Sequence, residues 1–109
     1  ADIEMNVSGG YDPTETAEDS RLIQAELATY RKLGVSANLS PRMAGSWPGA
    51  VFTAPPVSLP AGHFGIGHGA GAHAPDEYFV IDSTNPKVAG ITDATMGFVE
   101  MMFQLAMAR

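Results

Sequence analysis

The chain has 109 residues, the size of one domain or of part of a larger one. Hydrophobic residues make up 45% and charged residues 17%, which is typical of a globular protein rather than a disordered one. The net charge of −6 argues against nucleic acid and anionic membranes as partners, because both are bound by clustered Lys and Arg. Cysteine is absent, which excludes disulfides, thiolate metal sites and a cysteine nucleophile.

Targeting signals are not evident. No apolar run approaches the ~20 residues of a membrane-spanning helix. Residues 1–4 are acidic and lack the basic segment that opens a secretory signal, so we expect a cytoplasmic protein. They also lack an initiator Met, which leads us to expect that the chain begins inside a longer one.

The first third of the chain predicts a strand and then a helix. Residues 2–7 alternate apolar and polar side chains, as a strand with one exposed face does. Residues 20–33 place apolar side chains at helical spacing. Asp19 or Ser20 can cap the start of this helix, and Gly34 suits the position after its last turn.

The middle of the chain predicts short elements among loops. Residues 35–39 alternate again and predict a short strand, whereas residues 41–75 are broken by Pro and Gly. Within that stretch a short helix can begin at Pro48, and residues 64–66 suit a strand. Residues 78–81 form a further short apolar run. Loops this long in a compact domain are usually functional or disordered, and the absence of low-complexity bias argues against disorder here.

The end of the chain predicts a long helix. Asn85 and Pro86 form an N-cap and first-turn pair, and the residues after them are apolar nearly all round. Such a helix has to be covered on more than one side. With the earlier elements it gives the mixed order of an α/β fold.

All three histidines lie in the Gly-rich stretch, at positions 63, 68 and 73. One hypothesis is a zinc site of His63, His68 and His73 with water as the fourth ligand. Three ligands from one flexible segment are poorly preorganised, however. We therefore favour ordinary loop histidines at His63 and His68.

His73 stands in a more specific pattern. The segment Gly71-Ala72-His73-Ala74-Pro75-Asp76-Glu77-Tyr78 closely resembles a metal-ligand motif of the zinc-dependent aminoacylase/carboxypeptidase family. That family includes acetylornithine deacetylases, succinyl-diaminopimelate desuccinylases, glutamate carboxypeptidases and carnosinase-like dipeptidases. The resemblance implies that His73 is a zinc ligand and that Glu77 supports the ligand or holds its loop.

A second match lies upstream. Arg42-x-x-Gly45-Ser46-x-Pro48 is similar to a motif of the dipeptidase branch, in which the Gly-Ser pair binds the substrate carboxylate. The resemblance implies this role for Gly45 and Ser46, with Arg42 in support, and free N–H groups at a helix start do attract anions. The alternative is a simple cap and turn before Pro48. Ala44 departs from the motif, which has a second glycine there, and Trp47 replaces a smaller apolar residue.

The opening residues 4–13 are similar to the last strand of the family's lid domain and the linker that follows it, so the resemblance spans nearly the whole chain in order. It implies that residues 1–12 end the lid, or dimerisation, domain and that residues 13–109 form the C-terminal part of a three-layer α/β catalytic domain. The parent would be a homodimeric metallopeptidase that uses two zinc ions to hydrolyse an amide bond of a dipeptide or N-acyl amino acid.

The hypothesis carries an expectation for the isolated chain, and one alternative stands beside it. The other zinc ligands and the general base of the family belong to sequence upstream of this chain, so the 109-residue chain alone is expected to be inactive. The alternative is a non-catalytic binding or assembly module, with the Gly/His-rich loop as its contact and the apolar last helix as an association surface.

Overall fold

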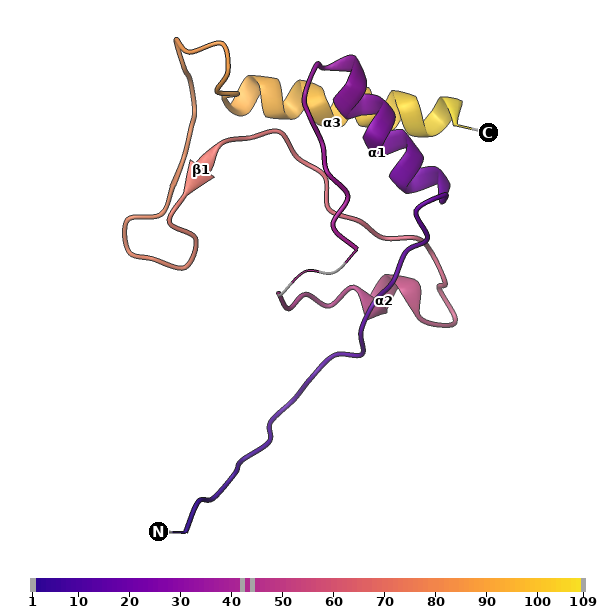
Figure 1. Cartoon of the computed structure of the whole chain (residues 1–109), viewed down its shortest axis with the longest axis vertical. Coiled ribbons are helices and arrows are strands. Elements are labelled where there is room, and N and C mark those ends of the chain that lie inside the picture. Colours follow the sequence, from indigo (N-terminus) through magenta and orange to yellow (C-terminus); the bar gives the residue numbers. More distant parts are fainter. Residues whose placement is uncertain (1, 42, 44, 109) are drawn as a thin grey trace.

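The computed structural model describes residues 2–41, 43 and 45–108. Its elements in chain order are α1 (Arg21–Lys32), α2 (Ala50–Thr53), β1 (Gly69–Ala70), β2 (Tyr78–Phe79) and α3 (Ile91–Met107). Figure 1 shows α1 crossing α3, the β1–β2 hairpin on an arm to one side, and the N-terminal segment leading away from both. The Cα radius of gyration is 17.5 Å, against about 13 Å for a compact domain of similar length, so the shape is open.

Helix α1 forms where the sequence predicts it. The Ser20 hydroxyl accepts a hydrogen bond from the Ile23 N–H at 3.4 Å and caps the start. At the other end Gly34 has φ +68°. The Gly34 N–H donates to the Arg31 carbonyl and the Val35 N–H to the Tyr30 carbonyl, which is the Schellman pattern that ends a helix.

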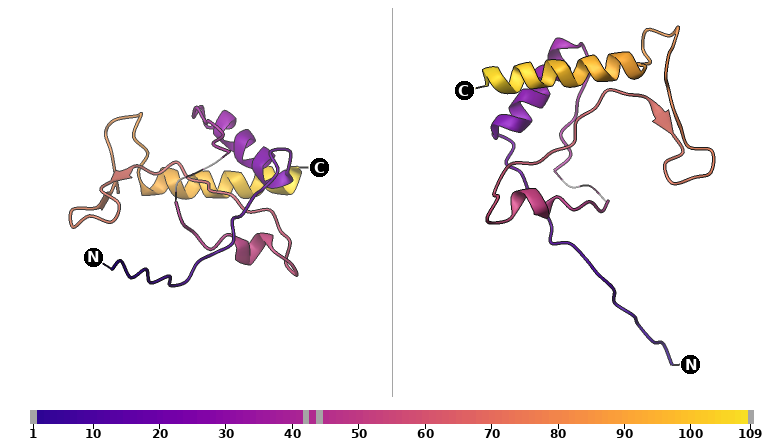
Figure 2. Two further views of the ribbon diagram at one scale, coloured as in Figure 1. Left: turned by 60° about the horizontal axis from the view of Figure 1, so that its bottom comes forward. Right: turned by 180° about the vertical axis from the view of Figure 1, so that it is seen from behind.

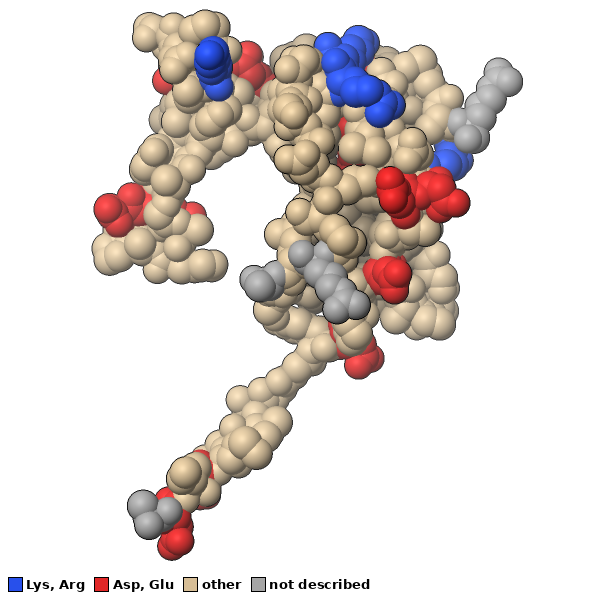
Figure 3. Space-filling model, in the orientation of Figure 1, with Lys and Arg blue, Asp and Glu red and all other residues tan. Residues whose placement is uncertain are grey.

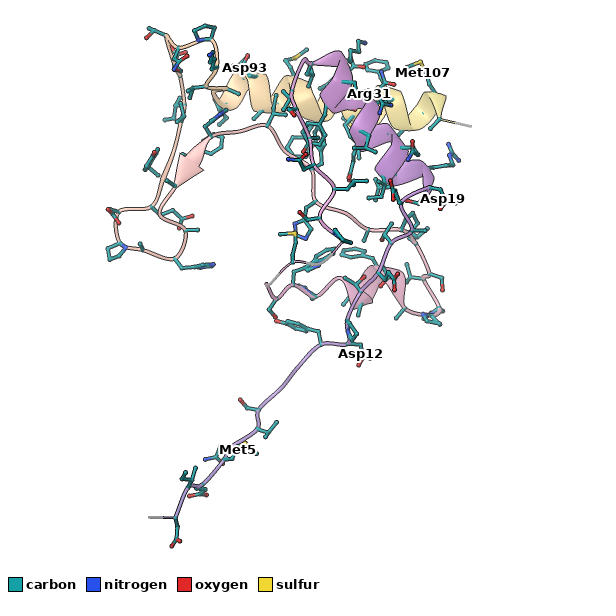
Figure 4. The ribbon with its side chains drawn as sticks, in the orientation of Figure 1. Met5, Asp12, Asp19, Arg31, Asp93 and Met107 are labelled. Carbon is teal, nitrogen blue, oxygen red and sulfur yellow. The ribbon has the colours of Figure 1, made fainter. Side chains whose placement is uncertain are left out.

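Helix α3 begins later than predicted, because the Asn85-Pro86 pair forms a turn instead of a cap. The Asn85 side chain accepts from the Lys87 N–H at 3.0 Å, and the Asn85 carbonyl accepts from the Val88 N–H. The helix starts only after Gly90, whose N–H donates to the Asp93 carboxylate at 3.0 Å. Figure 4 labels Asp93 in the first turn of α3 and Met107 at its other end.

The small core lies where α1 crosses α3. Ala25 and Thr29 of α1 are 1% and 0% exposed. On α3, Gly97 lets the Ile66 side chain come close, since a Cβ there would lie 3.1 Å from the Ile66 Cδ1. The ring of Phe64 packs between Tyr30 and Phe98, with centroids 5.0 and 5.3 Å away.

Those contacts explain why residues 64–66 form no strand. The Phe64 and Ile66 side chains pack where α1 and α3 cross, and the backbone of residues 64–66 pairs with no neighbouring strand among the described residues. Residues 35–39 likewise form no strand, so both predictions are wrong for the described chain. The sheet instead consists of β1 and β2, which pair antiparallel with Gly69 opposite Phe79 and Ala70 opposite Tyr78. The first two residues of the apolar run at 78–81 thus lie in a strand.

The N-terminal segment is attached to the body only from Thr14 onward. The Thr14 and Thr53 hydroxyls lie 2.7 Å apart, and the Thr16 hydroxyl donates to the Ala61 carbonyl at 2.6 Å. Residues 2–12 are exposed, and Figure 4 shows Met5 and Asp12 along a segment that leaves the body. The predicted strand over residues 2–7 is not formed, because no other described strand lies beside it (Figure 2).

Helix α2 follows Pro48 as predicted, with the Val51 N–H donating to the Pro48 carbonyl at 3.1 Å. Within the described chain α3 packs against α1 and residues 64–66 on one side, so the cover expected for its other sides stays a prediction. The large apolar side chains of α3 that are 49–62% exposed are Ile91, Met96, Phe98, Met102, Phe103 and Met107. The described chain is thus a helix pair with a small hairpin, and the three-layer α/β domain stays a prediction.

Candidate functional site

His73 lies in the turn that joins β1 to β2. Gly71 has φ +76° and its carbonyl accepts from the Ala74 N–H at 2.8 Å; the Ala74 carbonyl in turn accepts from the Glu77 N–H at 3.1 Å. Two tight turns therefore follow one another. His73 itself has φ +67°, a conformation that a non-glycine residue adopts at a cost. The local sequence fixes this turn almost alone, because it is built from neighbouring backbone groups.

The turn presents its polar side chains to solvent. His73 and Glu77 are both exposed. Glu77 holds the turn through its backbone N–H, and its side chain borders a 490 Å³ depression shared with Tyr78 and Phe79. Asp76 and Glu77 make this end of the arm acidic, which is visible as a red patch in Figure 3. Negative charge beside an imidazole favours the approach of a cation.

Gly45 and Ser46 lie in the exposed segment that leads into α2. The neighbouring Trp47 has a structural role, since its ring stacks on that of Phe52 with a centroid distance of 6.4 Å. Gly49 has to be glycine because a Cβ would lie 2.5 Å from the Thr14 and Trp47 side chains. Arg42, the third residue of the predicted carboxylate site, lies outside the described residues.

The two predicted parts of the site are not brought together in this structure. Figures 1 and 3 show the hairpin arm on one side of an open hollow and the segment leading into α2 on the other. Within the described ranges, no group of three or more His, Asp or Glu side chains could hold a metal ion. Among these residues His73 is thus a single exposed imidazole and not part of a formed coordination sphere.

The other two histidines have separate surroundings. The His63 ring meets the edge of Trp47 at a centroid distance of 4.6 Å. The His68 Nδ1 accepts a hydrogen bond from the Ala89 N–H at 3.0 Å, which connects the residue before β1 to the segment before α3. These contacts favour the interpretation of His63 and His68 as loop histidines with packing and anchoring roles.

Glu26 is a polar residue that the sequence analysis did not single out. It lies on α1 and is only 6% exposed, and burial raises the pKa of its carboxyl above the ordinary value. It borders a cavity of 310 Å³ together with Tyr30 and His63. A signal was present, because position 26 falls between Ile23 and Tyr30 on the apolar stripe of the helix.

Comparisons with models of protein families, with curated proteins and with solved structures gave no match for this chain. Among the helices of the described chain, none has the length and apolar character needed to cross a membrane.

Proposed function

We propose that this chain is the C-terminal part of a zinc-dependent amidohydrolase that cleaves an amide bond of a dipeptide or an N-acyl amino acid. The observation that carries the proposal is the segment from Ala72 to Tyr78, whose sequence resembles a zinc-ligand motif of the aminoacylase/carboxypeptidase family. Its position supports the proposal, because the turn holds an exposed imidazole beside Asp76 and Glu77 at the end of an arm.

The residues of the described chain do not by themselves fit a catalytic zinc ion. Such an ion takes three protein ligands and keeps a fourth position open, and His73 supplies one nitrogen donor. The proposal therefore requires donors from polypeptide outside this chain, and it assigns no catalytic step to the residues present here. What His73 contributes is one exposed imidazole, a side chain of the type that binds zinc through a ring nitrogen.

In the same proposal Gly45 and Ser46 bind the substrate carboxylate, with Arg42 in support. Gly45 and Ser46 are exposed, and a hydroxyl and backbone N–H groups are suitable donors to an anion. The open hollow between this segment and the hairpin arm leaves space for further polypeptide or a substrate (Figure 3). The proposed parent is a cytoplasmic homodimer with residues 1–12 in its lid domain.

Two experiments test the proposal together. The reading frame upstream of Ala1 is expected to encode a His-x-Asp segment and a later Glu-Glu pair, the donors that the motif needs. The purified 109-residue chain is expected to show no chelator-sensitive hydrolysis of dipeptides or N-acyl amino acids. A reading frame that starts at Ala1, or hydrolysis by the isolated chain that a chelator abolishes, contradicts the proposal.

A non-catalytic assembly module is the second candidate, and the exposed apolar face of α3 favours it. Six large apolar side chains about half exposed on one helix are more than a stable monomer usually leaves in contact with water. If this face mediates assembly, the chain associates as its concentration rises. A monodisperse monomer at high concentration in analytical ultracentrifugation contradicts this second candidate.

A further inference from the structure

The cavity beside Glu26 has the make-up of a small-molecule site. Its 310 Å³ are open to solvent on one side and bordered by three separate segments, which are α1, residues 35–39 and residues 63–65. Pockets that bind small ligands begin at about this volume and combine apolar walls with a few polar groups. The lining here is mixed, because Leu27, Val35 and Leu39 are apolar whereas Ser36, Asn38 and His63 are polar.

Glu26 is the one carboxylate among the described residues that border this cavity. More than nine-tenths of the residue is buried, and no charge or hydrogen bond from the described chain offsets the effect of that burial on its carboxyl. A buried carboxylate is costly unless it is paired with a cation or with hydrogen-bond donors. The cavity therefore holds a negative group without a described partner.

The backbone opposite Glu26 is shaped to accommodate the carboxylate. A Cβ on Gly62 would lie 2.9 Å from the Glu26 Oε1, so only glycine leaves both oxygens in place at this position. The neighbouring wall is also fixed, because the Tyr30 hydroxyl donates to the Gly65 carbonyl and accepts from the Gly65 N–H, both at 3.1 Å. These contacts preorganise the site around one unpaired charge.

We propose that this cavity binds a small protonated amine, with its ammonium group paired to the Glu26 carboxylate and its hydrocarbon part against Leu27 and Val35. An ammonium group satisfies the buried carboxylate by a charge-assisted hydrogen bond. Leu27 and Val35 offer apolar surface against which an alkyl body can pack. The site is separate from the proposed metal ligand, and it holds whether or not the amidohydrolase proposal does.

The test is a titration of the 109-residue chain with n-butylamine at neutral pH, followed by NMR shifts of the backbone amides. The expected result is saturable shifts of residues 35–39 and 63–65. n-Butanol, which has the same length but no charge, is expected to bind at least about tenfold more weakly, the loss of one charge-assisted hydrogen bond. Equal binding of amine and alcohol, or no saturable shift at millimolar amine, overturns the proposal.

Variants locate the site. Glu26→Gln keeps the shape of the side chain and removes its charge, and is expected to weaken amine binding at least about tenfold. Glu18→Gln, which removes an exposed carboxylate outside the cavity, serves as the matched control and is expected to bind as the parent does. Ala37→Phe fills the cavity from the loop side and is expected to abolish binding without touching any charge. Amine binding that survives Glu26→Gln or Ala37→Phe overturns the proposal.

Discussion

The helix pair and the hairpin arm are each stabilised by a different kind of contact. In the helix pair, residues far apart in sequence fix one another: Phe64 packs between Tyr30 and Phe98, and Lys32 forms an ion pair with Glu100 at 2.8 Å. In the arm, the turn around His73 is fixed by hydrogen bonds between residues three apart. The comparison shows that stability depends on the helix pair, whereas the predicted metal chemistry lies on a locally determined turn.

This difference predicts which substitutions affect folding. Gly90 joins the two regions, and a Cβ there would lie 2.6 Å from the backbone carbonyl oxygen of Ile81, which cannot move aside as a side chain can. Gly90→Ala is therefore expected to lower the free energy of unfolding by about 2 kcal/mol, the usual cost of overpacking. Denaturant unfolding followed by circular dichroism measures this.

Gly10→Ala is the matched control for that experiment, because nothing lies within 4 Å of a Cβ at position 10. It is expected to leave the free energy of unfolding unchanged. Equal effects of Gly90→Ala and Gly10→Ala would show that a Cβ at position 90 does not clash with the Ile81 carbonyl as the geometry indicates.

The second prediction concerns pH. Burial raises the pKa of the Glu26 carboxyl in the folded state above the usual value of 4.5, so the charged form opposes folding. The stabilising contribution of its protonated form is complete below pH 4.5 and is lost as the pH rises through the folded-state pKa. Glu26→Gln is thus expected to raise the melting temperature at pH 7, with a gain that disappears toward pH 4. A gain independent of pH contradicts this explanation.

The contribution of Glu100 to stability is expected to depend on pH in the opposite direction. Hydrogen bonds from Lys32 and Gln104 hold the pKa of its carboxyl below the usual value, so its contribution is lost as the pH falls through the folded-state pKa. Because both side chains of the ion pair reach solvent, the effect is expected to be small and to fade with added salt. Thermal melts of Glu100→Gln at low and high salt measure it, and a large salt-independent loss would contradict it.

The smallest effect on folding is expected at His73. His73→Gly relieves the positive φ but makes the unfolded chain more flexible, so the free energy of unfolding should change by less than about 1 kcal/mol. Denaturant unfolding checks this value. A change as large as that of Gly90→Ala would mean that the arm is part of the stable body.

The same distinction explains what the sequence allowed us to predict. Helix α1 was predictable because Ser20 and Gly34 act within a few residues of its ends. The start of α3 was not, because Asn85-Pro86 suits a turn as well as a cap, and the choice depends on the contact of Gly90 with Ile81. The strands predicted over residues 2–7 and 35–39 needed partners that alternation alone does not specify.

The candidate site also has a part that local residues fix and a part that depends on distant contacts. The turn that presents His73 follows from local residues, but the sequence could not place it relative to Gly45 and Ser46, because that relation depends on how the arm sits against the rest of the chain. Glu26 could have been found, since a carboxylate at position 26 interrupts the apolar stripe between Ile23 and Tyr30.

The most direct test of the proposed function is the zinc content and hydrolytic activity of the longer protein that the proposal requires. His73→Ala in that protein is expected to lower chelator-sensitive hydrolysis by roughly 100-fold or more and to reduce the bound zinc, because it removes the proposed ligand. His68→Asn, whose side-chain oxygen can take the place of the His68 Nδ1 as acceptor for the Ala89 N–H, is the matched control and should retain both. Unchanged zinc content and activity in His73→Ala would contradict the account.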